Sequence, residues 1–395
     1  MRVLLSAIGS RGEIEPMLAL GVRLLALGHG VRLVAPPDFA GLAEGFGIPF
    51  VPIGPDLSKP APPPMPTSAE GKRSVIEQTV FDQFEIVSEA AKGFDAIVGG
   101  GMLQLATHSV AERLGIPYHF GTFAAITLPS THHAPPPLGI PGAQPRPGES
   151  NESVWERDRH RFTATFGKPL NECRTSVGLP EIDDVRGHMC GDDPWLAADP
   201  TLGPWPGPGH VVQTGAWIRP DERPLDPELQ AFLDAGEPPV YFGFGSMRVP
   251  GELGHAAIKS ARELGRRVIV QRGWADLSLV DNAPDCIAIG EVNQQALFER
   301  VAAVVHHGGA GTTTTVARAA APQVVIPQRF DQFYWSERVE RLGIGRSHPS
   351  GEPTTESLVT ALGHVLQPEV SALAKAVAAE VATDGAQVAA ELIIG

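Results

Sequence analysis

A short apolar run near the start of the chain constrains the fold more than any other feature. The run VLLSAI (residues 3–8) stops at a glycine turn, GSRGE (9–13), and an apolar-periodic stretch starts near Pro16. A strand, a glycine turn and a helix in this order present polar groups at the carboxyl end of a parallel sheet. The sequence therefore predicts an α/β chain whose first turn carries a hydroxyl, a cation and a carboxylate.

The same alternation continues through the first half of the chain. Strand-like runs at 31–37, 96–101 and 116–120 are separated by helix-like stretches such as 16–30 and 105–115. Strands that alternate with amphipathic helices indicate a parallel, doubly wound sheet. Two proline-rich stretches, 54–68 and 128–148, break this pattern and are expected to be loops. They are either surface insertions or walls of a binding site.

A proline- and glycine-rich stretch at 198–229 marks a domain boundary, and the alternation restarts after it. We expect an N-terminal domain at 1–200, a linker at 201–229, a C-terminal domain at 230–373 and a last helix at 374–395. The predicted fold class is two Rossmann-like, doubly wound α/β domains that face a cleft.

Composition excludes several functional classes. The net charge of −14, without a lysine- or arginine-rich run, argues against a nucleic-acid or anionic-membrane partner. Three widely spaced cysteines fit a reduced, cytoplasmic protein better than a disulfide framework or a zinc site. No apolar run approaches the ~18–20 residues that span a bilayer, so we expect no stable membrane insertion.

The most informative stretch is VVHHGGAGTTTT (304–315), where an apolar strand runs into histidines, glycines and the start of a helix. Glycines let a ligand approach the backbone, and a helix N-terminus offers unpaired N–H groups to a diphosphate. His307 adds a donor, as do the threonine hydroxyls. A metal site is disfavoured, because adjacent residues in a strand point to opposite faces.

Standard motifs for other chemistries are absent from the sequence. The glycine stretch lacks the lysine of a P-loop, and neither glycine turn fits the dinucleotide fingerprint, so a kinase or a nicotinamide oxidoreductase is disfavoured. No D-x-D or G-x-S-x-G occurs. Asp331 and Gln332 follow the glycine stretch by about twenty residues, and their side chains can bind neighbouring hydroxyls of one sugar ring. A diphosphate-binding turn followed by a pair of residues that bind sugar hydroxyls suggests that the ligand is a nucleotide sugar.

These motifs resemble those of glycosyltransferases with the GT-B fold, and most closely those of the vancomycin group of glycopeptide antibiotics. The resemblance covers nearly the whole chain and is carried by GSRGEIEP, VQTGAWIRPDERPL, VYFGFGS, RGWADL, IGEVN, HHGGAGTT and DQ. It is poorest at 54–80 and 128–170, where such enzymes differ in acceptor. The resemblance implies that the domain at 1–200 binds the acceptor and the domain at 230–373 binds the nucleotide-sugar donor. It also implies that the helix at 374–395 crosses back to the first domain.

The resemblance implies a set of donor-binding residues, which fall into four groups. The diphosphate would be held by His307, Gly309, Gly311, Thr312 and Ser246, and the nucleotide base would be framed by Trp274 and Val292. The sugar hydroxyls would be bound by Asp331 and Gln332. The donor would be reached from the first domain by Ser10 and Arg11.

The resemblance also implies a catalytic base at Glu13, where the family usually has aspartate in the pattern GSRGD. A carboxylate can take the proton of an acceptor hydroxyl as the hydroxyl attacks the anomeric carbon. The extra methylene moves the carboxylate by about 1 Å or more. An alternative is that Glu13 is only a charge at the helix start and that Glu15 or a histidine is the base.

We therefore expect an inverting, metal-independent hexosyltransferase without a cofactor, whose co-substrate is UDP-glucose or a dTDP-sugar. The expected acceptor is a phenolic hydroxyl of a natural product such as a glycopeptide aglycone. A lipid or glycopeptidolipid hydroxyl is the alternative acceptor. Two other classes stay open: a non-catalytic nucleotide-sugar binding protein and a nucleotide-sugar epimerase, which would convert the donor without an acceptor.

Overall fold

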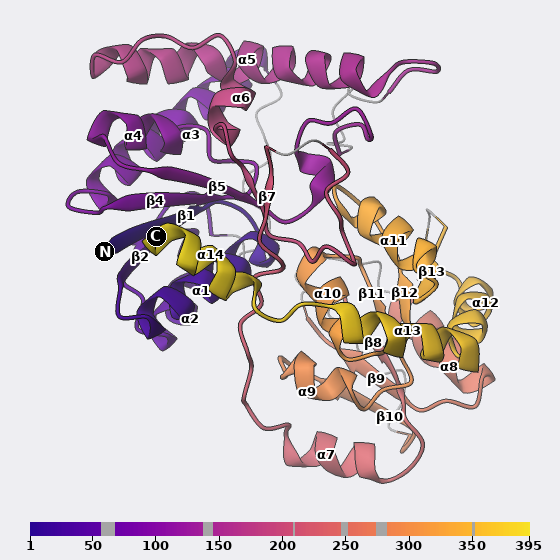
Figure 1. The fold of residues 1–395 in the computed structure, drawn as a ribbon. Helices are drawn as coiled ribbons and strands as arrows, with labels where there is room; N and C mark the ends of the chain where they lie inside the picture. Colours follow the sequence, from indigo (N-terminus) through magenta and orange to yellow (C-terminus); the bar gives the residue numbers. More distant parts are fainter. Residues whose placement is uncertain (57–67, 137–144, 208–209, 246–251, 274–282, 350–351) are drawn as a thin grey trace. The chain divides into compact units, whose positions relative to one another are not determined.

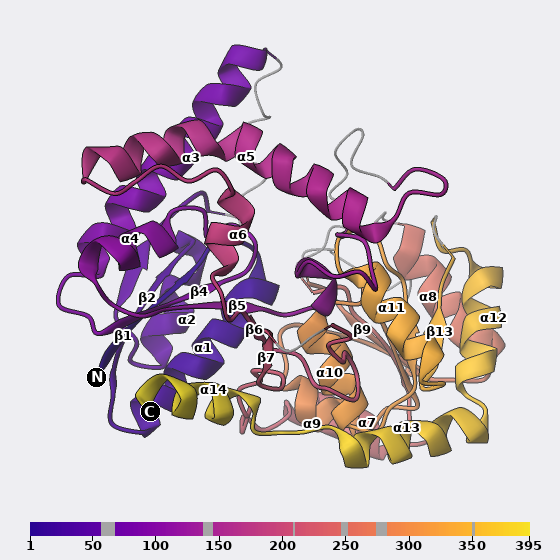
Figure 2. The same ribbon diagram turned by 45° about the horizontal axis from the view of Figure 1, so that its top comes forward.

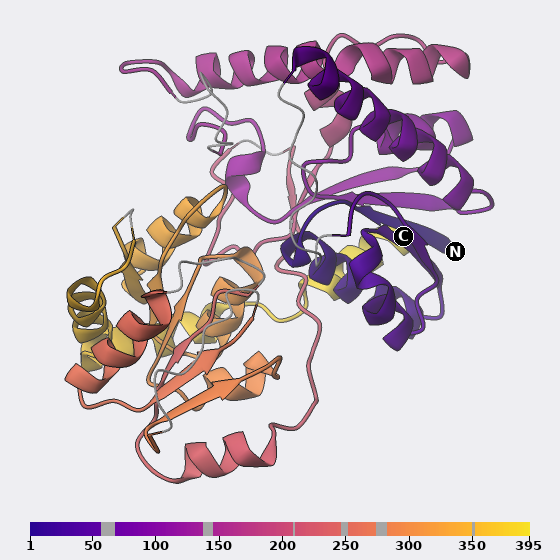
Figure 3. The same ribbon diagram turned by 180° about the vertical axis from the view of Figure 1, so that it is seen from behind.

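The chain folds into two compact units, which Figures 1–3 show from three directions in a computed structural model. The structure describes residues 1–56, 68–136, 145–207, 210–245, 252–273, 283–349 and 352–395. Unit 1 comprises Met1–Ala198, Trp205–Arg219 and Thr383–Gly395, and unit 2 comprises Asp199–Pro204 and Pro220–Ala382. Within the described residues, no helix combines the length and the apolar character needed to cross a bilayer.

Unit 1 is built on a parallel sheet of seven described strands. Their order is β3 (Phe50–Pro52), β2 (Gly30–Ala35), β1 (Arg2–Ala7), β4 (Ala96–Gly100), β5 (Tyr118–Thr122), β6 (Trp195–Leu196) and β7 (Val212–Gln213). In register, Leu5 pairs with Leu33 of β2 and with Val98 of β4. All three side chains are fully buried, as expected for strands that helices cover on both faces.

Helices cover both faces of this sheet (Figure 1). One face carries α3 (Ala69–Ala90), α4 (Thr107–Leu114), α5 (Asn151–Ser176) and α6 (Val185–Cys190), and the other carries α1 (Arg11–Ala26), α2 (Ala40–Gly45) and α14 (Gly385–Ile394). Short 3₁₀ turns, η1 (Pro37–Phe39) and η2 (Ala125–Thr127), complete the unit. Both chain ends lie in unit 1, close together in all three views, because α14 packs beside α1.

Unit 2 is built on a parallel sheet of six described strands. Their order is β10 (Cys286–Ile289), β9 (Val268–Gln271), β8 (Val240–Phe242), β11 (Ala303–His306), β12 (Gln323–Val325) and β13 (Gly345–Ser347). Val240 and Phe242 pack on the side of α8 (Glu252–Glu263) and α12 (Thr355–Val365). Tyr241, between them in sequence, packs on the opposite side with α7 (Pro227–Asp234), α9 (Gln294–Phe298) and α10 (Ala310–Arg318). This two-residue alternation is the signature of a strand between two helical layers.

Two further helices, α11 (Gln332–Arg341) and α13 (Pro368–Glu380), complete the described part of unit 2. The predicted class of two doubly wound α/β sheets is therefore confirmed. The boundaries expected from sequence differ in detail from what is observed. The stretch 201–229 contributes β7 to the first sheet and begins α7, and the segment after 374 contains the end of α13 and a separate helix, α14. The acceptor and donor roles of the two halves stay predictions.

Candidate active site

Glu13 lies where the strand order of the first sheet reverses. The chain winds outward from β1 to β2 on one side and continues from β4 to β5 on the other, so the crevice between the ends of β1 and β4 is the switch point. Ligands of open α/β sheets bind at such crevices. We expected the helix to start near Pro16, but α1 begins at Arg11, because Ser10 is extended and ends the strand-to-helix turn. Glu13 therefore belongs to the first helical turn.

Two glycines leave the space that the Glu13 side chain fills. A Cβ on Gly9 would lie 2.8 Å from Glu13 Cδ, and one on Gly101 would lie 3.0 Å from Glu13 Cγ. Gly101 also has a φ of +82°, a left-handed conformation that favours glycine. Sequence reasoning missed Gly101, although the run GGG at 99–101 after an apolar strand was a visible signal. The half-buried carboxylate is thus held by backbone from two strand ends.

Ser10 and Glu13 form a pair of their own. The spacing S-x-x-E at a helix start is that of a capping box, in which each side chain would bond to the backbone N–H of the other residue. Here Ser10 is the N-cap residue but makes no side-chain cap bond, and its Oγ donates to Glu13 Oε2 at 2.8 Å. The hydroxyl is therefore used to orient the carboxylate.

Arg11 is engaged by a neighbour on its own helix. Its Nε donates to Glu15 Oε1 at 3.0 Å, and Arg219 also approaches Glu15, with 4.0 Å between Nη2 and Oε2. The Arg11 side chain stays 42% exposed, so the pair contributes only a few tenths of a kcal/mol, as is typical of i,i+4 pairs. Glu15, the alternative base, thus has two arginines as neighbours.

His307 lies at the switch point of the second sheet, between the ends of β8 and β11. The turn after β8 passes close to it, since a Cβ on Gly245 would lie 3.5 Å from His307 Cε1. His307 Nδ1 is buried and has no hydrogen-bond partner among the described residues. A buried polar atom without a partner is costly unless a ligand or water satisfies it. The predicted contacts Ser246 and Trp274 lie outside the described residues.

The surroundings of His307 favour the neutral form of its side chain at pH 7. Burial, and to a smaller extent the positive charge of Arg329, lowers the pKa of His307 to about 4. A neutral imidazole offers one N–H donor and one acceptor. Arg329 was not among the predicted donor contacts, although it directly precedes the FDQ segment in sequence. It places positive electrostatic potential at the same turn.

The N-terminus of α10 follows His307 and is open to a ligand. Its N-cap residue is Gly309, which has no side chain that could accept a hydrogen bond from the first N–H groups of the helix. A Cβ on Gly309 would lie 2.7 Å from His307 Nε2, whereas one on Gly311 would meet no atom of the described residues within 4 Å. The two predicted glycines thus differ: Gly309 makes room for His307, and Gly311 is exposed.

The four threonines of α10 differ in whether their hydroxyls are hydrogen-bonded to the helix backbone. The hydroxyls of Thr313, Thr314 and Thr315 donate to carbonyls four residues earlier, at 2.9, 2.9 and 2.8 Å. Such back-bonding occupies their only proton. Thr312 makes no such bond within the described part of α10, and it is the threonine that was predicted to contact the diphosphate.

Asp331 and Gln332 begin α11, and both have local partners. Asp331 Oδ2 accepts from the indole of Trp335 at 3.1 Å, and Gln332 Oε1 accepts from the backbone N–H of Gln328 at 2.9 Å and of Arg329 at 3.1 Å. Phe330 just before them has a φ of +54° and is 42% exposed. A non-glycine residue in this region is strained, and such strain gathers at functional sites.

Val292, predicted to frame the base, lies between β10 and α9 and packs partly on the core of unit 2. The next residue, Asn293, accepts from Ala296 N–H at 3.1 Å and donates to the carbonyls of Asp221 and Arg223 at 2.7 and 2.8 Å. Asn293 therefore fixes the loop that carries Val292.

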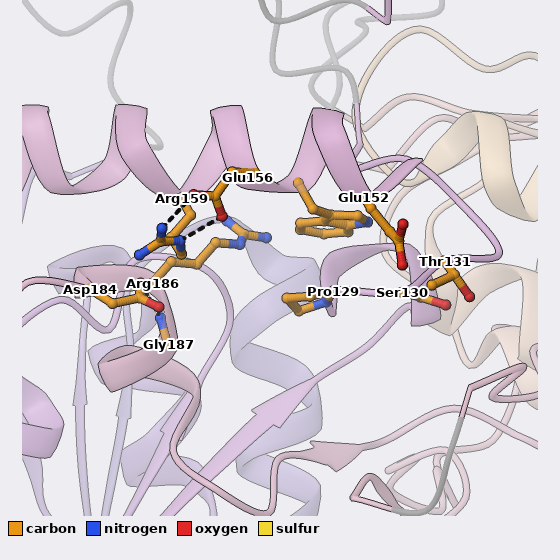
Figure 4. A pocket seen from close by; sticks show the side chains of 10 residues that line it. Pro129, Ser130, Thr131, Glu152, Glu156, Arg159, Asp184, Arg186 and Gly187 are labelled. Carbon is orange, nitrogen blue, oxygen red and sulfur yellow. Dashed lines mark hydrogen bonds and ion pairs between the residues drawn. The ribbon is translucent and has the colours of Figure 1, made fainter. Parts of the chain in front are cut away.

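Unit 1 also holds a cavity of about 360 Å³ on the segment expected to line the acceptor site. In Figure 4, Glu152 of α5 lies near Ser130 and Thr131 at one end of the cavity. Glu156 and Arg159 of the same helix lie at the other end, near Asp184 and Arg186. Arg186 is 3% exposed and donates to Thr127 O at 2.9 Å. Seven of the ten lining residues have polar or charged side chains, but apolar atoms form most of the surface of the cavity. Among the described residues, no group of three or more His, Cys, Asp or Glu side chains could hold a metal.

Known relatives share both halves of this arrangement. The Glycosyltransferase family 28 N-terminal domain matches residues 3–132, and the Erythromycin biosynthesis protein CIII-like C-terminal domain matches 255–393. Two proteins of Amycolatopsis orientalis, Glycosyltransferase GtfE and Vancomycin aglycone glucosyltransferase, are 50% and 49% identical over 100% of this chain and 97% of each relative. The chain belongs to the vancomycin-group glycosyltransferases.

Other comparisons agree with this glycosyltransferase assignment. The dTDP-epi-vancosaminyltransferase of Amycolatopsis orientalis is 43% identical over 95% of this chain and 93% of its own length. Two solved structures share the fold: the glycosyltransferase of kitacinnamycin (TM-score 0.73, 19% identity, 100% and 98% coverage) and the glycosyltransferase VinC with DTDP (0.67, 20%, 100% and 99%). The predicted GT-B fold, family and enzyme class are confirmed. The roles of the individual site residues stay predictions.

Proposed function

We propose that this glycosyltransferase transfers a hexose, with glucose favoured, from a UDP- or dTDP-sugar to a phenolic hydroxyl of a glycopeptide-type aglycone. The observation that carries the proposal is the turn after β11. It joins a buried His307 Nδ1, which has no hydrogen-bond partner within the described part of the chain, to the N-terminus of α10, where the described residues provide no side-chain cap bond. Such a turn suits the oxygens of a diphosphate, because a helix N-terminus stabilises negative charge.

The names of the relatives support the choice of substrates. One is a vancomycin aglycone glucosyltransferase at 49% identity, and another is a dTDP-epi-vancosaminyltransferase at 43%. Between their sugars, Asp331 and Gln332 favour a well-hydroxylated hexose, because a carboxylate and a carboxamide can bind adjacent hydroxyls.

The proposed reaction is a single displacement. Glu13 accepts the proton of the acceptor hydroxyl, whose oxygen forms a bond to the anomeric carbon as the bond to the diphosphate oxygen breaks. The electron pair of that bond leaves with the nucleoside diphosphate, and the configuration at the anomeric carbon inverts. Helix dipole, backbone N–H groups and His307 stabilise the leaving charge, so the proposed mechanism needs no metal.

A transfer assay tests this proposal. The protein is incubated in EDTA with UDP-glucose or dTDP-glucose and a glycopeptide aglycone that has a free phenol. Mass spectrometry should find the aglycone plus one hexose, and NMR should show an anomeric configuration opposite to that of the donor. Conversion of the sugar without acceptor would favour the epimerase, and donor binding without any turnover would favour the non-catalytic protein.

A further inference from the structure

The first histidine of the HHGG motif has no role in the mechanism above, yet both of its ring nitrogens are engaged. His306 ends β11 and is 0% exposed. The backbone N–H of Gly308 donates to its Nδ1 at 3.1 Å, and its Nε2 lies 2.9 Å from Gln323 Oε1. A backbone N–H can only donate, so Nδ1 must be the acceptor. The ring proton is therefore on Nε2, which donates to Gln323.

Gln323 continues this chain of bonds to the helix. It is the first residue of β12, also 0% exposed, and its Nε2 donates to the carbonyl of Thr313 at 3.3 Å. Thr313 lies in the first turn of α10. The hydrogen bonds that join Gly308, His306, Gln323 and Thr313 thus hold the glycine turn at Gly308 and the first turn of α10. They lie where β11, β12 and α10 meet in the second unit (Figures 1 and 2).

The turn needs such fixing because its conformation is unusual. Gly308 has a φ of +89°, and a Cβ there would lie 2.6 Å from Val325 Cγ1 and 3.1 Å from Gln332 O. The bond from its N–H sets the plane of the peptide that joins it to His307. That plane decides where the His307 ring and the following N–H groups point. A rotation of this peptide would direct the Gly308 N–H away from His306.

We propose that His306 is a positioning residue, whose neutral ring holds the Gly308 peptide so that His307 and the N-terminus of α10 converge on the donor diphosphate. This inference rests on the proposed function, since it assumes that the turn binds a nucleoside diphosphate. The burial of His306 is consistent with this inference. Burial lowers the pKa of His306 to about 3, so the Nδ1 lone pair stays available at neutral pH.

Two substitutions distinguish the hydrogen bond at Nδ1 of His306 from the one at Nε2. His306→Asn keeps an acceptor at the position of Nδ1 but loses the reach to Gln323. His306→Gln keeps a donor near the position of Nε2 but offers no acceptor to Gly308 N–H. Both variants remove buried contacts, so both should lower Tm.

Calorimetric titration with UDP and dTDP then gives the decisive comparison. His306→Asn should keep the Kd within about threefold of the wild type, and His306→Gln should weaken it about tenfold or more, which corresponds to about 1.4 kcal/mol. In turnover assays the loss should appear in KM for the nucleotide sugar more than in kcat. Equal losses in both variants, or none in either, would overturn the inference.

A second measurement uses the wild type and does not depend on variants that fold. Nitrogen NMR of the His306 ring should show the Nε2–H tautomer from pH 6 to 8, with and without nucleoside diphosphate. An Nδ1–H tautomer would contradict the inference, because that nitrogen could no longer accept from Gly308. If the wild type binds neither UDP nor dTDP, the proposed function itself fails, whatever the tautomer.

Discussion

The Ser10 hydroxyl donates its only proton to Glu13 Oε2, 2.8 Å away, at the start of α1. This bond joins two residues that were expected to act on different substrates, Ser10 on the donor and Glu13 on the acceptor. While the proton points at Glu13, the hydroxyl cannot also donate to a phosphate oxygen. We therefore expect Ser10 to act first on the orientation of the carboxylate.

Replacing Ser10 by alanine tests this relationship. Ser10→Ala should lower kcat about tenfold while KM for the nucleotide sugar stays within about twofold, because the lost contact orients the base. Ser10→Thr, which keeps a hydroxyl, is the matched control and should retain most of the activity. A raised KM with unchanged kcat would instead assign Ser10 to the donor.

The carboxylate itself is tested by Glu13→Gln and Glu13→Asp. Glu13→Gln keeps the shape but cannot accept the proton, so kcat should fall by about 10²–10⁴-fold while UDP or dTDP binds as before. Glu13→Asp keeps the charge but retracts it from Ser10, so we expect an intermediate loss. Steady-state kinetics and calorimetry measure both effects. Activity of Glu13→Gln near that of the wild type would move the base to another residue.

The left-handed backbone of Phe330 predicts an effect on stability. Its φ of +54° costs about 1–2 kcal/mol for a residue with a Cβ, and its ring is already 42% exposed. Phe330→Gly removes this cost but increases the conformational entropy of the unfolded chain, which offsets part of the gain. The free energy of unfolding should therefore rise by about 0.5–1 kcal/mol. Phe330→Ala keeps the Cβ and should give no gain. Urea unfolding compares the two, and equal effects would mean that the backbone is not strained.

One buried and two half-buried histidines predict how stability depends on pH. Burial lowers the pKa of His188 and His306 to about 3 and that of His307 to about 4, against 6.5 in the unfolded chain. Their contribution to stability is therefore present above pH 6.5 and is lost as the pH falls from 6.5 toward 4, because the unfolded state binds protons first.

Each of these histidines can add a slope of up to about 1.4 kcal/mol per pH unit in that window. Urea unfolding at pH 7.5, 6 and 5 should show a steep loss of stability. His188→Gln should make the slope shallower. A stability that is flat from pH 7.5 to 5 would contradict the lowered pKa values of these three histidines.

Local patterns in the sequence were enough to predict the strands that carry the site. The apolar runs at 3–8 and 302–305 correspond to β1 and β11, and the glycine turns that follow them lie at the two switch points. The 26-residue helix α5 was missed because it is rich in charged residues and contains Pro169. A polar, proline-containing segment carries little helical periodicity.

Contacts between distant residues could not be predicted in the same way. Gly101 packs on Glu13 only because β4 pairs with β1, and that pairing is a property of the sheet order. The S-x-x-E spacing of Ser10 and Glu13 was visible, but it favours a capping box, and the observed bond between the two side chains depends on the space left by Gly9. The link from His306 to Gln323 likewise depends on neighbouring strands.

The central claim is that the turn after β11 binds a nucleoside diphosphate, and calorimetric titration tests it most directly. UDP, dTDP, UDP-glucose, dTDP-glucose and NAD are titrated separately into the wild type and into His307→Ala, with EDTA present. The account predicts that uridine or thymidine diphosphates bind far more tightly than NAD and that His307→Ala weakens them about tenfold or more. Binding of NAD alone, or of none of the five, would contradict it.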